Sequence, residues 1–421
     1  MTSQPGYRRV RALPENMALR VSRNRSTLAG AASASRSRGF RVSRAALQWF
    51  LLALVVRLVA CVLIHLYSLA LGYGGFYPIA SGADDVSYFE LTQRIYNGQD
   101  VPFISNDYPY VLALFYRFAG GPDLLVGQLL NVLAGAITVG FGVLLVQELT
   151  RKVAVQERKR AVRLAGLLLT FYPSLLWYST QLVKDPLLVM FGMAALYFQV
   201  RLLRRFHPGM ALGWLISFAG LFPFRAYAAA ALAFSLLIYI LRFKPKLLVP
   251  AFVALAVFPY LLGKGWFGLS LLQGVAVNAD TVAQFRQSAY SVGGSSAGIT
   301  INYSNPVSFL LTYSYSFATA MFGPFPWQIK AMGQAIALPE AMGMWLLFPL
   351  WLRGVRDLRR RVKPREEARR EVALLIFSLV LIGVIAIFSD NIGANTRLRL
   401  LPWGAFLLYA SLKMPRVKQQ R

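Results

Sequence analysis

Two adjacent carboxylates, Asp84 and Asp85, follow the first long apolar run, in the stretch SGADDVSYFELTQRIYNG at 81–98. The rest of the chain is strongly basic, with a formal net charge of +28, so an acidic pair at this point requires an explanation. A carboxylate can take a proton from a hydroxyl group as a general base, or it can bind a divalent metal ion. Asp84 and Asp85 are therefore the first candidates for catalytic residues.

A small set of cations stands apart from the basic clusters, at the ends of apolar runs. Lys184 lies beside Asp185, Arg225 lies between two runs, and Arg397 and Arg399 precede the last run. Side chains at helix ends can converge at the mouth of a cavity between helices. Several lysine and arginine side chains there would bind an anionic phosphate or pyrophosphate through charge-assisted hydrogen bonds. Together with the acidic pair, they indicate a site for transfer from a phosphate-linked donor.

The acidic residues also have a purely structural explanation. Asp84 or Asp85 would serve well as the N-cap of the amphipathic helix that the following residues predict. Asp185 stands directly before Pro186, which is the usual order of an N-cap and the first helical residue. A cap uses one carboxylate, so one member of the pair Asp84 and Asp85 remains for chemistry. The sequence does not show which one it is.

The elements that would position these residues are membrane-spanning helices. The chain has 421 residues, of which 57% are hydrophobic and 15% are charged, whereas a soluble domain carries about a quarter charged residues. Apolar runs of about twenty residues recur from residue 46 onward, which is the length of a transmembrane helix. Basic residues gather in short clusters between these runs rather than on one face with interleaved aromatics, which argues against nucleic acid as a partner.

Basic loops of membrane proteins stay on the cytoplasmic side of the membrane, and this rule gives a topology. It predicts an all-α polytopic protein with about ten crossings and with both termini in the cytoplasm. Two further apolar segments, 108–120 and 305–327, do not fit as crossings and are predicted to be helices at the outer interface. The approximate crossings are 46–72, 123–149, 162–180, 187–203, 209–224, 226–241, 247–262, 335–353, 371–389 and 399–413.

This topology divides the chain into three parts. Residues 1–45 are predicted to be a disordered basic cytoplasmic tail, 46–412 a transmembrane domain, and 413–421 a short basic cytoplasmic tail. The outer face receives two large loops, 73–122 and 263–334. The acidic pair lies in the first of these loops, so it is predicted to face the outside of the membrane.

Two ionisable residues, Arg57 and His65, fall inside the first predicted crossing. Ionisable groups within a membrane span are functional candidates by default, because burying them in lipid is costly. Each also has a structural explanation, which we favour. Arg57 could extend its side chain toward the cytoplasmic interface, and a neutral His65 could form a hydrogen bond to a neighbouring helix.

Several segments in order resemble the GT-C superfamily of polytopic glycosyltransferases, and in particular its bacterial, family-39-like members. The acidic pair is followed by Tyr88, then by DYPYVLALFYRFAGG at 107–121, STQLVKDPLLVMFGMAALYF at 179–198, FGPFPWQ at 322–328 and NIGANTRLRLLPWGAFLL at 391–408. The resemblance covers about 46–412. It implies a GT-C-like transmembrane fold and an enzyme that uses a polyprenyl-phosphate-linked sugar as its donor.

The resemblance also implies a mechanism. An acidic residue of the first outer loop, here Asp84 or Asp85, would deprotonate the acceptor hydroxyl, while basic residues at outer helix ends hold the lipid phosphate. A hexose or pentose would pass, with inversion, to a glycan, lipid or protein acceptor at the outer, periplasmic face of the bacterial inner membrane. Participation of Mg²⁺ or Mn²⁺ is left open, with the acidic pair as its ligands. The residues assigned to substrate binding are Tyr88, Lys184, Asp185, Arg225, Arg397 and Arg399.

Two other functions fit the same composition. A polysaccharide polymerase or ligase acting on undecaprenyl-pyrophosphate glycans would depend on Arg397 and Arg399 more than on Asp84 and Asp85. A lipid flippase or solute transporter would carry inverted repeats and acidic residues at the middle of the membrane. No such repeat is evident in the sequence, and the acidic pair is predicted at the interface, so we favour the glycosyltransferase.

Overall fold

The computed structural model describes residues 43–76, 84–101, 106–243, 286, 296–302, 305–330, 335–361 and 366–413, which lie in one compact unit, Val42–Arg421. Within these ranges the regular structure is helical, apart from one isolated antiparallel bridge between Ser296 and Asn391. This confirms the all-α fold class. Nearly all of the predicted tail at 1–45, the crossing at 247–262, part of the outer loop at 263–334 and the tail after 413 fall outside the described residues.

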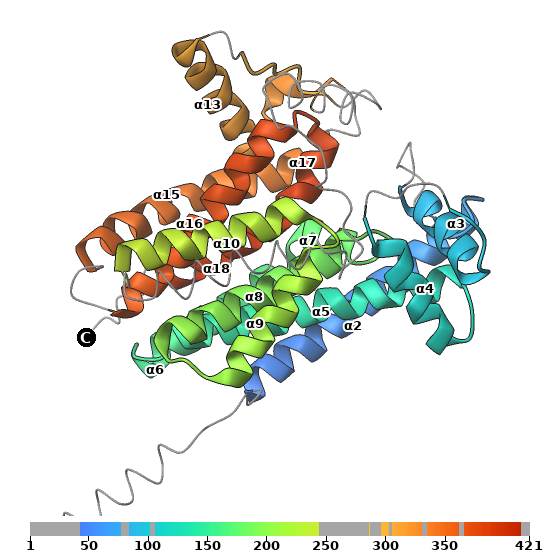
Figure 1. The fold of residues 1–421 in the computed structure, drawn as a ribbon, viewed down its shortest axis with the longest axis horizontal. Helices are drawn as coiled ribbons and strands as arrows, with labels where there is room; N and C mark the ends of the chain where they lie inside the picture. Colours follow the sequence, from blue (N-terminus) through green and yellow to red (C-terminus); the bar gives the residue numbers. More distant parts are fainter. Residues whose placement is uncertain are drawn as a thin grey trace, which may run out of the picture. The chain divides into compact units, whose positions relative to one another are not determined.

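The helices follow the predicted apolar runs closely (Figure 1). The N-terminal half contains α2 (Arg44–Ala70), α3 (Asp84–Tyr96), α4 (Tyr108–Ala119), α5 (Leu124–Leu149), α6 (Val155–Phe171), α7 (Pro173–Tyr178), α8 (Asp185–Arg204), α9 (Pro208–Leu221) and α10 (Ala226–Phe243). The C-terminal half contains α13 (Pro306–Phe322), the 3₁₀ turn η3 (Pro326–Gln328), α15 (Leu338–Arg361), α16 (Glu366–Phe388), α17 (Ile392–Leu398) and α18 (Leu400–Lys413).

Local sequence signals explain where several of these helices begin. A side-chain oxygen of the N-cap residue accepts a hydrogen bond from the N–H three residues later in α2, α5, α13 and α17. The N-cap residues of these helices are Ser43, Asp123, Asn305 and Asn391. Proline also begins or nearly begins α4, α7, α8, α9 and α13, as expected where the missing N–H would have no helical partner.

Among the described residues, five helices are long and apolar enough to cross a membrane: α2, α5, α8, α10 and the Ala368–Phe388 part of α16. Four more helices coincide with predicted crossings but are shorter or interrupted. These are α6, which stops before Pro173; α9, with 14 residues; α15, which contains Pro349; and α18, also with 14 residues. Each predicted crossing that the structure describes thus contains a helix, with a break at Tyr172 and turns at 179–180 and 222–224.

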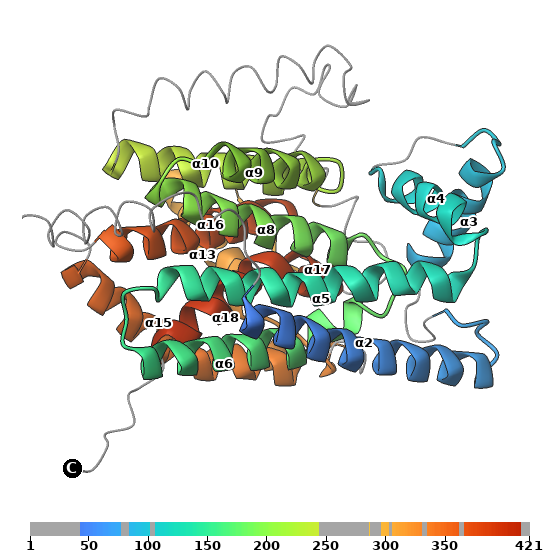
Figure 2. The same ribbon diagram turned by 90° about the horizontal axis from the view of Figure 1, so that it is seen from below.

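The core of the bundle forms around α5, which packs against α2, α6 and α8, while α16 packs against α10, α13 and α18 (Figure 2). Helix α18 is buried on all sides from Leu400 to Ser411. Small residues allow the closest approaches: the ring of Trp49 lies against Gly166, and the side chain of Leu401 lies against Gly192. A Cβ atom at either glycine would overlap its neighbour, so the residue type sets the spacing of the helices.

The first outer loop contains two helices, α3 and α4, which pack together at the end of the bundle where α2 ends and α5 begins (Figures 1 and 2). Helix α4 is amphipathic: Tyr108, Leu112 and Tyr116 are fully buried, whereas Leu114 and Phe118 on the opposite face are exposed. The helix expected at 108–120 is therefore confirmed. Its exposed apolar face is suited to the membrane interface.

A cluster of ion pairs holds the opposite end of the bundle. The carboxylate of Glu148, at the end of α5, lies 2.6 Å from Arg204 of α8, 3.6 Å from Arg370 of α16 and 3.9 Å from Arg201. Lys413 of α18 pairs with Glu371 of α16, the residue that follows Arg370. Arg204 is the last residue of α8, so this cluster lies roughly 30 Å from the first residue of the same helix.

Replacing Glu148 with glutamine should destabilise the fold. The side chain of Glu148 is only 9% exposed, and breaking a buried ion pair from one side typically costs about 3 kcal/mol of the free energy of unfolding. Thermal unfolding of the purified protein in detergent would measure the loss. Glu90→Gln, at an exposed position of α3, is the matched control and should melt close to the wild type. Equal melting temperatures for all three proteins would contradict a role for this cluster in stability.

Candidate functional site

The site begins with an ion pair between residues 313 positions apart in the sequence. Nη1 of Arg397 donates to the carboxylate of Asp84, which joins the first outer loop to the segment before α18. Asp84 lies in the first turn of α3 and Arg397 in the last turn of α17. The helix macrodipole favours an anion at the first position and a cation at the second. Both side chains keep access to solvent, at 45% and 29% exposure.

The second acidic residue, Asp85, is placed differently. It is only 5% exposed, and its Oδ1 accepts a hydrogen bond from the backbone N–H of Val86 at 3.0 Å. Both carboxylates belong to the first turn of α3 as the structure describes it. Neither makes the side-chain bond to the second or third following N–H that an N-cap makes. The capping explanation is therefore wrong for this pair, and the structure separates an accessible aspartate from a buried one.

Asp185 does not cap α8 either, contrary to the capping explanation. Lys184 occupies the N-cap position without a side-chain cap, and Asp185 is the first helical residue. Asp185 is 1% exposed, and its Oδ1 accepts a hydrogen bond from Nη2 of Arg225 at 3.0 Å. A buried carboxylate needs a charged or hydrogen-bonding partner, and Arg225, between α9 and α10, supplies it. The pair joins α8 to the turn at 222–225.

The connection that carries Lys184 is held by a buried amide. Asn131 of α5 is fully buried, and its Nδ2 lies 2.5 Å from the carbonyl oxygen of Gln181 and 2.7 Å from that of Val183. The same nitrogen lies 3.1 Å from the hydroxyl of Tyr108, the first residue of α4. One side chain thus fixes the backbone just before Lys184 and ties it to the first outer loop. Nothing in the sequence distinguishes Asn131 from other polar residues of apolar runs.

Tyr88 lies on α3 next to this connection. Its hydroxyl accepts a hydrogen bond from Nδ2 of Asn106 at 3.1 Å, and its ring packs edge-on against Tyr108. Burial, with a further contribution from the negative charges of Asp84 and Asp185, raises the pKa of Tyr88 to about 12. The phenol therefore stays protonated at neutral pH and can donate a hydrogen bond.

Arg399 lies apart from the other basic residues that the sequence predicts to bind phosphate. It is 1% exposed, donates to the carbonyl oxygen of Gly323, and its guanidinium lies 3.7 Å from the centre of the Trp403 ring. Arg397 is only two residues away, but residues two apart on a helix do not share a face. The structure therefore places Arg397 beside Asp84 and Arg399 in the interior, against the end of α13.

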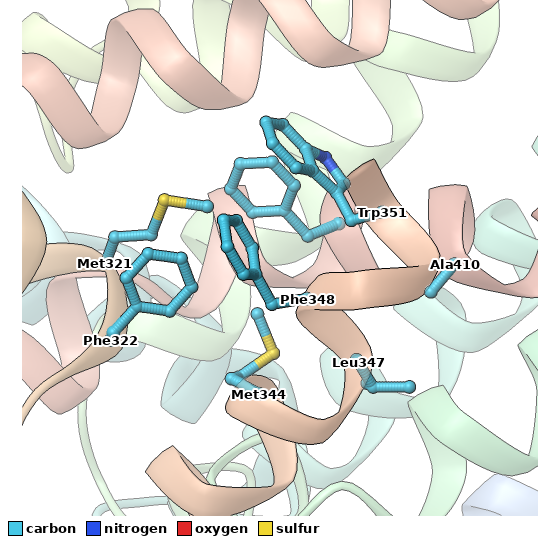
Figure 3. A pocket seen from close by; sticks show the side chains of 8 residues that line it. Met321, Phe322, Met344, Leu347, Phe348, Trp351 and Ala410 are labelled. Atoms are coloured by element: carbon cyan, nitrogen blue, oxygen red, sulfur yellow. The ribbon is translucent and has the colours of Figure 1, made fainter. Parts of the chain in front are cut away.

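A small apolar pocket lies at the end of α13, where Met321 and Phe322 line it (Figure 3). Its walls come from the end of α13, from one face of α15 and from α18. Two indole N–H groups fix the end of α13 at its edge: Trp345 donates to Phe322 at 2.8 Å and Trp403 donates to Met321 at 3.0 Å. The lining residues are Met321, Phe322, Met344, Leu347, Phe348, Trp351, Phe406 and Ala410.

Five residues form what we call the charged cluster: Asp84, Lys184, Asp185, Arg225 and Arg397. Burial lowers the pKa of Lys184 to about 8. The positive charges of Arg225 and Arg397 also lower this pKa, whereas the carboxylates of Asp185 and Asp84 raise it. For Arg397 burial also favours the neutral form, but Asp185 and Asp84 outweigh it and hold the pKa above its ordinary value. Three cations thus face two carboxylates, an arrangement that attracts a further anion.

A metal ion was the other role considered for the acidic pair. Among the residues that the structure describes, no three histidine, cysteine, aspartate or glutamate side chains come together. Asp84 is engaged by Arg397, and Asp85 points to the backbone N–H of Val86. The binding of Mg²⁺ or Mn²⁺ by the acidic pair therefore stays a prediction from the resemblance.

The two ionisable residues of α2, Arg57 and His65, form hydrogen bonds to different helices. Nδ1 of His65 lies 3.1 Å from Oε1 of Gln128 on α5, which confirms the hydrogen bond to a neighbouring helix. Arg57 does not extend toward an interface. It is 1% exposed and donates to the backbone carbonyl groups of Leu169 and Thr170. The interfacial explanation for Arg57 is therefore wrong.

Comparison with known proteins adds a fold relationship. No protein-family model matches the chain, and no curated protein matches it. The fold is similar to that of a solved chain described as ArnT from Cupriavidus metallidurans bound to undecaprenyl phosphate, with a TM-score of 0.53 and 16% sequence identity. The match covers 86% of this chain and 59% of the ArnT chain, so this chain spans less than two thirds of that chain's length. The likeness shows that the two chains share an all-α fold.

The charged cluster predicts an unusual titration for Lys184. The rate of acylation of its amine should reach half its maximum near pH 8 rather than near 10.5, the ordinary pKa of lysine. Because the folded protein gives up this proton more readily than the unfolded chain, Lys184 makes stability increase with pH between these two values. Mass spectrometry after brief labelling at a series of pH values would measure the midpoint, with the exposed Lys159 as the internal standard for reagent activity.

Arg225→Gln should raise this midpoint, because it removes a neighbouring positive charge and leaves the carboxylate of Asp185 without its arginine partner. A midpoint near 10.5 in the wild-type protein, or one that Arg225→Gln leaves unchanged, would show that Lys184 does not belong to the cluster.

Proposed function

We propose that this protein is a membrane glycosyltransferase that moves a sugar from a polyprenyl-phosphate-linked donor to an acceptor hydroxyl, with Asp84 as the general base. The observation that carries the proposal is the charged cluster, in which one accessible carboxylate lies against an arginine, next to two further cations. The fold likeness to a protein described as bound to undecaprenyl phosphate supports the same substrate class.

The phosphate of the donor would bind among Lys184, Arg225 and Arg397. Arg225 and Arg397 are already paired with Asp185 and Asp84, so they are held in place before any ligand arrives. No carboxylate of the described residues lies within ion-pair distance of Lys184, which therefore has ammonium protons to give to a phosphate oxygen. A bound phosphate would in turn favour the charged form of Lys184.

Asp84 is better suited than Asp85 to act on the acceptor. A general base must come within hydrogen-bond distance of the hydroxyl that it deprotonates. The side chain of Asp84 is 45% exposed, whereas Asp85 is 5% exposed and faces its own backbone. Asp84 also sits beside the cations that would hold the donor, so the hydroxyl and the anomeric carbon could be held together.

In the transfer step the acceptor oxygen attacks the anomeric carbon and its proton passes to Asp84. The bond from that carbon to the phosphate oxygen breaks, and the electron pair remains on the polyprenyl phosphate, whose negative charge increases. The cations of the cluster stabilise this charge. Protonation of Asp84 neutralises the partner of Arg397, so the guanidinium can turn its full charge toward the departing phosphate. A single displacement of this kind inverts the configuration at the anomeric carbon.

The hydrocarbon part of the donor needs an apolar surface, which we propose is supplied by the exposed apolar side chains of the helices, such as Leu114 and Phe118 of α4; the pocket lined by methionine and aromatic side chains (Figure 3) is small. We place the cluster at the outer, periplasmic face of a bacterial inner membrane, because the basic loops of the sequence gather at the other ends of the helices. The sugar is proposed to be a hexose or pentose, and the acceptor a glycan, a lipid or a protein.

Asp84→Asn tests the proposal directly. Loss of a general base should lower the rate of transfer by about 10²- to 10⁴-fold, measured with a labelled polyprenyl-phosphate sugar in membranes that contain the variant. Asp85→Asn is the matched control, because it changes the neighbouring carboxylate and keeps an oxygen that can accept from Val86. It should keep at least about a tenth of the activity.

Thermal unfolding would show that both variants are folded before their rates are compared. Full activity of folded Asp84→Asn would refute the assignment of the base. A large loss in Asp85→Asn alone would transfer that role to Asp85.

A further inference from the structure

Arg57 is a buried cation in the middle of α2 that the proposed chemistry does not use. Its Nη2 donates to the carbonyl oxygen of Leu169 at 2.9 Å, and its Nη1 donates to that of Thr170 at 3.4 Å. Both acceptors lie in the last turn of α6. An arginine in a membrane span usually marks a function or a structural need, and here the partners are backbone groups of another helix.

Those carbonyl groups are available because of Pro173. In an uninterrupted helix the N–H of residue 173 would donate to Leu169, but proline has no N–H and its ring opposes helix continuation. Helix α6 accordingly ends at Phe171, and α7 starts afresh at Pro173. Carbonyl groups left open within a bilayer are costly unless another donor reaches them. The guanidinium of Arg57 is that donor, so it stabilises the break.

The segment after the break leads directly to the charged cluster. The hydroxyl of Tyr178, the last residue of α7, lies 2.7 Å from Oγ1 of Thr396, which precedes Arg397. The connection then runs on to Lys184. Arg57 also touches this region through Gly135 of α5: a Cβ atom there would lie 2.7 Å from Nε of Arg57 and 2.8 Å from Cβ of Ser179. Helices α2 and α5 therefore meet the end of α7 at close contact.

A small cavity borders Arg57 and α7. It is lined by Arg57, Gly135, Thr138, Leu175, Tyr178, Ser179, Pro186, Val189 and Leu400. Three of these residues belong to α7 or follow it directly, and Pro186 follows Asp185. Helix α7 thus borders a small cavity, so its position depends on the bonds that hold it.

We propose that Arg57 is a positioning residue for the charged cluster: it satisfies the carbonyl groups released at Pro173, and through α7 and the connection at 179–184 it sets Lys184 beside Arg225 and Arg397. Arg57 contacts no substrate in this account. The functional meaning of the inference rests on the proposed function, since the cluster is the phosphate site there, but the placement of Lys184 can be tested without any donor.

The test uses the titration of Lys184 as a readout of its surroundings. Arg57→Met removes the guanidinium and keeps a side chain of similar length, so the cluster should open to water. The half-point of Lys184 acylation should then move upward from about 8 by one pH unit or more, toward 10.5. Arg57→Lys, which can reach one carbonyl group, should give an intermediate value.

The matched control is Arg370→Met, which removes an arginine that is also buried but pairs with Glu148 at the far end of the bundle. It should lower the melting temperature and leave the half-point near pH 8. Gly135→Ala is a second variant in case Arg57→Met does not fold. It keeps every charge but crowds Arg57 and Ser179, and it should also raise the half-point.

A half-point that stays near pH 8 in folded Arg57→Met and in Gly135→Ala would overturn the inference. So would an equal rise in Arg370→Met, because the effect would then be a general consequence of lost stability. Kinetics add a second criterion if transfer activity is found: Arg57→Lys should raise the KM for the donor more than it lowers kcat. The labelling result is readable whether or not the protein transfers sugar, so failure of the proposed function and failure of this inference are distinguishable.

Discussion

The fold depends on a single constraint: a charge inside a membrane protein must have a partner, because burying it alone is prohibitively costly. Arg397 meets Asp84, Arg225 meets Asp185, and three arginines surround Glu148. Arg57 uses backbone carbonyl groups for the same purpose. Each of these contacts joins segments that are far apart in the sequence. The ionic contacts therefore fix the positions of helices that apolar packing alone would hold less specifically.

The same constraint gives the site its proposed chemistry. Two of the three cations of the charged cluster are held by carboxylates, and Lys184 completes the set with a pKa lowered to about 8 by burial and by its basic neighbours. Such a cluster is stable without a ligand and still attracts an anion. In the proposed reaction the carboxylate that holds Arg397 is also the base, so proton uptake by Asp84 and charge stabilisation at the phosphate are coupled through one ion pair.

Much of the fold could be predicted from the sequence, because apolar runs separated by basic clusters determine helices and their order. The helices of the first outer loop and the grouping of Asp84 with Lys184, Asp185, Arg225 and Arg397 were also within reach. The sequence could not separate Arg397 from Arg399, since that depends on the direction of two side chains at a helix end. It also could not show that Asp85 is buried, that Arg57 meets carbonyl groups released by Pro173, or that Asn131 holds the connection before Lys184. All of these are contacts over long sequence distances, which local patterns do not encode.

The most direct test of the central claim is whether a polyprenyl phosphate shields Lys184. A membrane-impermeant acylating reagent would be added to the outside of sealed, right-side-out membranes at pH 8, and modification of Lys184 would be followed by mass spectrometry with and without added polyprenyl phosphate. The account predicts that Lys184 is modified from the outside and that polyprenyl phosphate slows its modification several-fold, whereas the matching polyprenol, which lacks the phosphate, does not. Equal rates with the phosphate, with the alcohol and without either would contradict it.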